Sequence, residues 1–165
     1  MKKAQYRKLR KNSKYIKAVL LLCKDNNINC SIKHRSDNSK YRGLNGFCSA
    51  ATEKITLNIF NETTTQVFVS SACHEISHVL CKRQGKYANY HSPKPLKNRT
   101  IKELKQLIKI SLKAEKYVDV IGKGVCSITF PEIKYIPTYW KESGKYGHQR
   151  YYNDRIRYLI KSKRC

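Results

Sequence analysis

The feature that most constrains this chain is an apolar segment, residues 67–80, which carries two histidines and a glutamate near its middle. Helix signals lie on both sides of it. Thr63 and Gln66 have the spacing of a capping box, Lys82 and Arg83 stand where a last turn is expected, and Gly85 fits a C-terminal cap. A helix that is apolar on nearly every side is buried, so the segment predicts a central helix of about five turns.

The polar residues of this segment form the pattern His74-Glu75-Ile76-Ser77-His78. Residues four apart lie on one face of a helix, so His74 and His78 can bind one Zn²⁺ ion together, at about 2.0–2.1 Å. Glu75 points to the adjacent face, where it can accept a proton from a zinc-bound water. Burying these side chains is costly unless they are paired or bind a metal. The pattern therefore predicts a zinc-dependent hydrolase with Glu75 as the general base.

The rest of the chain predicts an α+β fold in one domain. Residues 13–25 have helical periodicity, and residues 29–34, 46–51 and 54–60 have the alternation or the composition of strands. These segments predict a sheet of about three strands, in which residues 51–53 close a hairpin between the last two. At 165 residues the chain has the length of one domain, so we expect residues 1–165 to form a single domain with basic N- and C-terminal extensions.

A second long helix is expected from the capping signal at Thr100 and Glu103 to about residue 121. Its inward face begins with apolar residues, namely Leu104, Ile108 and Leu112. Continuing this face at helical spacing leads to two carboxylates, Glu115 and Asp119. The opposite face carries lysines, and a basic, tyrosine-rich tail follows that we expect to end in a helix.

A catalytic zinc ion needs a third protein ligand and an open position for water. The sequence offers two candidates. If Glu115 binds the metal, this explains why a carboxylate stands on an inward helix face. Asp119, one turn later, is then placed to hydrogen-bond a ligand histidine. His91 is the alternative ligand, on the polar loop that follows the helix of His74 and His78. If both bound the metal together with His74 and His78, no position would remain open and the site would be structural.

His-Glu-x-x-His followed by Glu115-Lys116-Tyr117-Val118-Asp119 on a later helix resembles the gluzincin metallopeptidases, and the order of elements resembles the ImmA/IrrE-type enzymes of bacteria and phages. This resemblance covers roughly residues 40 to 125. It implies a zincin-like fold with a protein or peptide substrate and with His74, His78 and Glu115 as zinc ligands. It also implies that the strand at residues 55–60 aligns an extended substrate.

The spacing from His78 to His91 is also similar to that of the SprT-like, DNA-associated proteases, although Ser92-Pro93 departs from their pattern. The metzincin pattern is excluded, because Cys81 and Gln84 stand where that family has a glycine and its third histidine. Four side chains of the C-terminal region are chemically suited to stabilise the oxyanion of a peptidase: Tyr139, His148, Tyr151 and Tyr152.

The formal net charge of +24 favours contact with polyanions. The lysines are spread along the whole chain, so the charge predicts non-specific nucleic-acid contact at most, and an AT-rich genome explains it equally well. A third interpretation of the chain is therefore a non-catalytic, basic nucleic-acid-binding protein with a structural zinc ion.

The cysteines and the N-terminus bear on the compartment. Seven cysteines without a Cys-x-x-Cys pair favour reduced thiols. The apolar run at residues 18–23 is too short for a signal peptide or a membrane span. We therefore expect a cytoplasmic protein of a bacterium or of a phage-infected cell.

Overall fold

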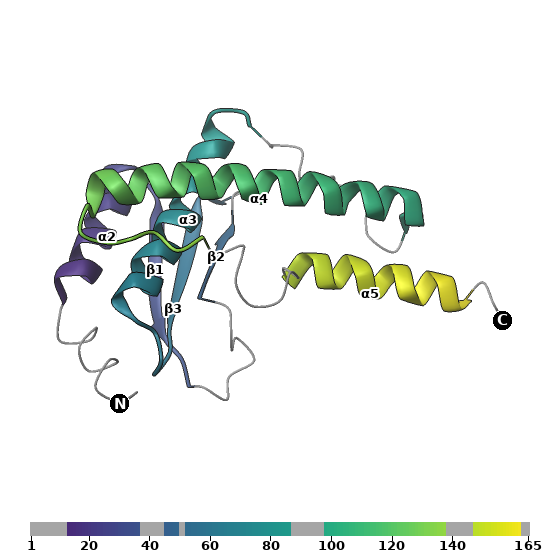
Figure 1. Cartoon of the computed structure of the whole chain (residues 1–165), viewed down its shortest axis with the longest axis horizontal. Helices are drawn as coiled ribbons and strands as arrows, with labels where there is room; N and C mark the ends of the chain where they lie inside the picture. The colour runs from purple at the N-terminus through teal and green to yellow at the C-terminus, as the bar shows by residue number, and fades with distance from the viewer. Residues whose placement is uncertain (1–12, 37–44, 50–51, 87–97, 138–146, 163–165) are drawn as a thin grey trace.

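The computed structural model describes residues 13–36, 45–49, 52–86, 98–137 and 147–162. Within these residues the chain forms α2 (Ser13–Asp25), β1 (Asn29–His34), β2 (Gly46–Ser49), β3 (Lys54–Ile59), α3 (Thr65–Arg83), α4 (Ile101–Thr129) and α5 (Gly147–Ser162). The predicted α+β class is confirmed, and so are the three predicted strands, the first helix and the C-terminal helix (Figure 1).

The three strands form a small mixed sheet in the order β1-β3-β2. Strand β1 pairs with β3 in parallel, and β2 pairs with β3 in the antiparallel sense expected of a hairpin. The expectation that residues 55–60 align a substrate is wrong, because β3 is the central strand and both of its edges are paired. Strand β2 lies at an edge of the sheet and contacts α3. Its Gly46 pairs with Leu57 of β3.

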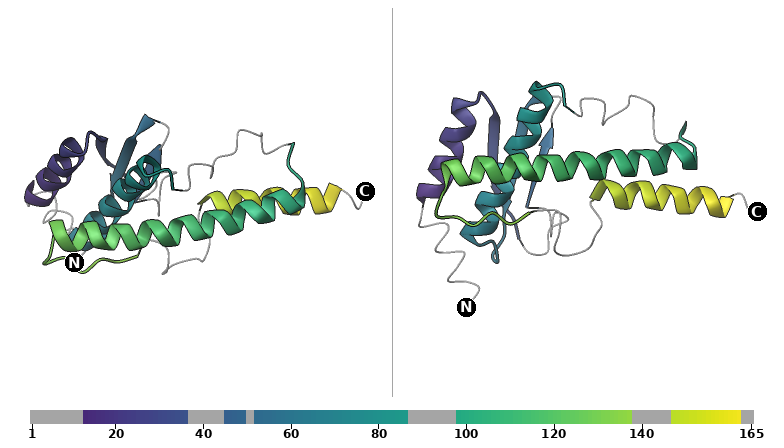
Figure 2. Two further views of the ribbon diagram at one scale, coloured as in Figure 1. Left: turned by 90° about the horizontal axis from the view of Figure 1, so that it is seen from above. Right: turned by 45° about the horizontal axis from the view of Figure 1, so that its top comes forward.

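Helix α3 lies between the sheet and α4, as the long α4 crosses it in Figure 1 and Figure 2. Inward residues of the sheet, α2, α3 and the C-terminal part of α4 share one core, which includes Val19, Ile55, Leu57, Phe68, Ile76 and Cys126. Twelve residues of α3 are buried, so the prediction of a central buried helix is confirmed.

The ends of α3 differ slightly from the prediction. The N-cap is Thr64, whose side chain accepts a hydrogen bond from the backbone N–H of Val67, so the predicted cap at Thr63 is wrong by one residue. The hydroxyl of Thr63 instead accepts from the N–H of Phe60 and stabilises the turn before the helix. At the other end Gly85 has a φ of 68°, and the N–H groups of Gly85 and Lys86 bond back to Lys82 and Cys81, which is a glycine C-terminal motif.

Helix α4 begins as predicted, with a complete capping box between Thr100 and Glu103, but it continues to Thr129 instead of ending near residue 121. Gly122 does not end the helix; it serves a close contact. A Cβ at this position would lie 2.8 Å from the hydroxyl of Tyr135 and 3.4 Å from the carbonyl oxygen of Cys73 on α3. The inward face also differs in detail, because Leu107 and Ser111 are buried whereas Ile108 and Leu112 are only partly so.

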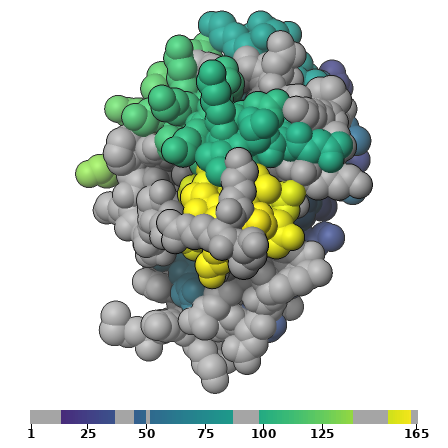
Figure 3. All heavy atoms as spheres, turned by 90° about the vertical axis from the view of Figure 1, so that its right-hand side faces the viewer, coloured from purple at the N-terminus to yellow at the C-terminus, as the bar shows by residue number. Residues whose placement is uncertain are grey.

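The N-terminal part of α4 extends beyond the main core and packs on α5. Leu104, Leu107 and Ile156 form a small second cluster there. Figure 2 shows α5 beside this part of α4 in both views, and Figure 3, from the end where α4 begins, shows the surface of α4 directly above that of α5. None of the helices in the described ranges is long and apolar enough to cross a membrane.

Candidate metal centre

Three side chains from two helices converge at the contact between α3 and α4. Nε2 of His74 lies 3.1 Å from Nε2 of His78 and 3.2 Å from Oε2 of Glu115. The remaining distance, from Nε2 of His78 to the same oxygen of Glu115, is 3.4 Å. Tetrahedral ligands at 2.0–2.1 Å from a zinc ion lie about 3.3–3.4 Å from one another, so the triangle has the size that such an ion needs. His74, His78 and Glu115 can therefore hold one metal ion.

The side chain of Asp119 fixes the orientation of the first histidine. Its Oδ1 lies 3.0 Å from Nδ1 of His74, and the hydroxyl of Tyr135 donates to the same oxygen at 2.7 Å. Because a carboxylate oxygen accepts, Nδ1 of His74 carries the proton and donates. The lone pair on Nε2 of His74 then points toward His78 and Glu115. Electron-rich atoms that face one another in a buried site are stabilised by a cation between them, and this chemistry fits a metal ion.

Electrostatics around the triangle agree with this assignment. Burial disfavours the charged form of His74, but hydrogen bonds to Asp119 and Glu115 outweigh burial and raise its pKa to about 10. The pKa of Glu115 falls well below its usual range, because hydrogen bonds from His74 and His78 overcome the effect of burial. The side chains at this position thus attract positive charge, whether a proton or a metal ion supplies it.

Glu75, the predicted general base, is buried on the neighbouring face of α3. Its side chain packs against the first residue of β2: a Cβ on Gly46 would lie 2.9 Å from its Cγ and 3.1 Å from its Oε1. Burial raises the pKa of the Glu75 carboxyl, although His74 and His78 lower it again. Only a glycine at the start of β2 leaves room for this side chain.

The structure brings together most of the residues predicted for the site. His74, Glu75, His78, Glu115 and Asp119 lie at one contact between α3 and α4. Of the other candidates, His91 and Tyr139 lie outside the described residues. His148, Tyr151 and Tyr152 belong to α5, but their side chains also lie outside the described part of the chain.

Two site residues were not predicted from the sequence. Tyr135 reaches Asp119 from the segment that follows α4, which the hydroxyl of Ser70 holds by accepting a hydrogen bond from the N–H of Ile136. Gly46 contacts Glu75 from a short strand. Neither residue stands in a pattern with the histidine motif, so no signal in the sequence connects them with it.

Comparison with known proteins adds no family assignment. No protein-family model matches the chain, and neither the curated proteins nor the solved structures gave a match.

Proposed function

We propose that the protein is a zinc-dependent metallopeptidase of the zincin type, with His74, His78 and Glu115 as ligands and Glu75 as the general base. The observation that carries the proposal is the triangle of two imidazole nitrogens and one carboxylate oxygen, with sides of 3.1, 3.2 and 3.4 Å. Two histidines and a glutamate are a ligand set of catalytic zinc sites in peptidases, and three protein ligands leave a fourth position open for water.

Peptide hydrolysis assigns a distinct task to each side chain. When bound, the zinc ion supplies Lewis acidity, which lowers the pKa of a water molecule and polarises a carbonyl group. Glu75 accepts the proton of the attacking water and later donates it to the leaving amine. Asp119 holds the imidazole of His74 in the tautomer that binds metal. Tyr135 donates a hydrogen bond that stabilises Asp119 in this position.

The surroundings of Glu75 support hydrolysis rather than a structural metal site. A structural site is closed by a fourth protein ligand and needs no carboxylate on the adjacent face. Within the described residues His74, His78 and Glu115 form the group that can hold a metal ion, and the buried Glu75 lies beside it on α3. Strand β2 borders Glu75, so an extended peptide that pairs with β2 would pass the general base.

The test compares the wild type with Glu75→Gln. The amide has nearly the size of the carboxylate but cannot take a proton, so we expect zinc to remain bound and hydrolysis of an internally quenched peptide library to be lost. Zinc is measured by mass spectrometry of the metal in the same samples. Full hydrolysis by Glu75→Gln would refute the assigned role, and wild type that holds zinc without cleaving any peptide would favour a structural site.

A further inference from the structure

All six lysines of α4 lie on one side of the helix. They are Lys102, Lys105, Lys109, Lys113, Lys116 and Lys123, and every one is exposed. At 3.6 residues per turn these positions fall within an arc of about 80° around the helix axis. The exposed residues of α4, taken together, cover a much wider arc. We call this surface the lysine stripe. From the first lysine to the last it is about 32 Å long at a rise of 1.5 Å per residue.

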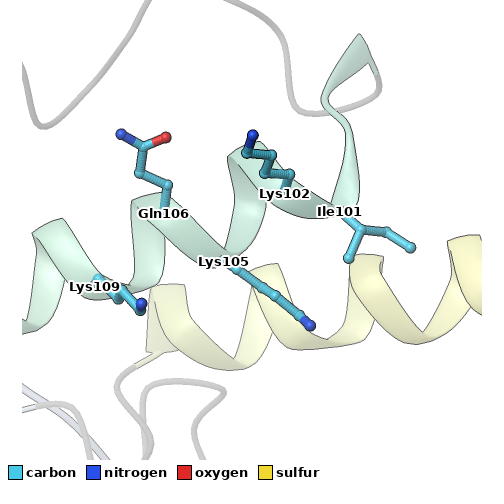
Figure 4. A pocket seen from close by; sticks show the side chains of 5 residues that line it. All are labelled: Ile101, Lys102, Lys105, Gln106 and Lys109. Carbon is cyan, nitrogen blue, oxygen red and sulfur yellow. The ribbon is translucent and has the colours of Figure 1, made fainter.

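Four lysines of the stripe have no acidic partner among the described residues. Within the described part of the chain Lys102, Lys105, Lys109 and Lys113 form no ion pair, and the carboxylates of α4 lie elsewhere on the helix. Three of these lysines line an open hollow of about 480 Å³ together with Ile101 and Gln106 (Figure 4). Like charges at this spacing repel one another, so binding of an external anion would stabilise the arrangement.

We propose that the lysine stripe binds the phosphate backbone of duplex DNA without regard to sequence. The stripe has nearly the length of one turn of B-DNA, about 34 Å, along which a duplex presents a dense row of phosphates. It carries no aromatic side chain, and unpaired bases are bound largely by stacking on aromatic groups. Its only large apolar residue is Val120, so it lacks the apolar surface with which a basic helix enters a membrane interface.

The stripe and the metal site occupy different sides of α4. Glu115 lies about 120° around the helix from the middle of the lysine stripe. The carboxylate points toward α3, where it is buried, whereas the lysines point to solvent. A duplex on the stripe therefore leaves His74 and His78 uncovered, and DNA binding is separable from anything that the metal centre does.

The experiment separates the placement of charge from its amount. One variant replaces four lysines of the stripe by glutamine, at Lys102, Lys105, Lys109 and Lys113. The control replaces four exposed lysines of α2 and the sheet, at Lys17, Lys24, Lys33 and Lys54. Both lose four charges. Binding to a 20-base-pair duplex of mixed sequence is followed by fluorescence anisotropy from 50 to 200 mM salt, after circular dichroism has shown that both variants fold.

We expect the slope of log K against log salt to be less steep by about 3 to 4 in the stripe variant, because each lost phosphate contact removes about 0.9. The control variant should keep most of the wild-type slope. Equal losses in both variants, or an unchanged slope in the stripe variant, would overturn the proposal. So would tighter binding of wild type to an oligo(dT) strand of equal length, or to phosphatidylserine vesicles, than to the duplex.

Discussion

Gly46 provides a selective test of the role of Glu75. Replacing it by alanine places a Cβ 2.9 Å from Cγ and 3.3 Å from Cδ of Glu75. Ordinary carbon contacts need about 3.5–4.0 Å, so the Glu75 side chain must move by at least about 0.5 Å. Gly46 is not in the left-handed region, so its backbone accepts alanine. The three atoms nearest to the new methyl group all belong to Glu75 and none to His74, His78 or Glu115.

We therefore expect Gly46→Ala to keep its zinc and to lose activity. A misplacement of 1 Å at a catalytic group costs up to about 100-fold, so a shift of half that size predicts a fall in kcat of roughly tenfold or more. The assay is hydrolysis of the peptide that the wild type cleaves fastest, with zinc content measured in parallel. The matched control is Gly124→Ala on α4, where a Cβ meets nothing within 4 Å. Unchanged kcat in Gly46→Ala would refute the position assigned to Glu75.

Three further predictions concern the groups around the metal centre. Tyr135→Phe removes a hydrogen bond to Asp119, so we expect zinc affinity to fall by about tenfold in a competition with a fluorescent chelator; unchanged affinity would show that Asp119 orients His74 without Tyr135. Thr100→Ala removes half of the α4 capping box, which predicts a loss of about 1 kcal/mol and a Tm lower by about 2–4 °C, with zinc content unchanged; an unchanged Tm would contradict this. Because the pKa of His74 is raised to about 10, its protonation stabilises the metal-free protein most below about pH 6.5 and progressively less up to pH 10. The gain in Tm on adding zinc should therefore be larger at pH 8.5 than at pH 6; equal gains would argue against His74 as a ligand.

Periodicity and capping patterns predicted the local structure well. The strands, the first helix and the start of α4 lie where their patterns placed them, because each depends on neighbours in the sequence. The N-cap of α3 was missed by one residue because three consecutive threonines are all competent caps, and the choice depends on a turn in which Thr63 bonds to Phe60. The end of α4 was predicted too early, because a glycine such as Gly122 commonly ends a helix. Here the glycine instead allows α4 to pack closely against Cys73.

Long-range features account for the remaining differences. The order β1-β3-β2 depends on a parallel crossover, and nothing local to residues 55–60 shows that both edges of that strand are paired. The pairing of Glu115 with the histidines was predicted because a carboxylate on an inward helix face needs a partner. The contacts of Tyr135 and Gly46 follow from packing between segments far apart in the chain.

The central claim is that Glu115 completes a metal site with the two histidines of α3. Its most direct test is the zinc content of wild type, Glu115→Ala and His91→Ala after dialysis against a mild chelator. The structure predicts about one zinc ion per chain in wild type and in His91→Ala, and little or none in Glu115→Ala, which has lost one of three ligands. Full zinc in Glu115→Ala, or none in wild type, would contradict the account.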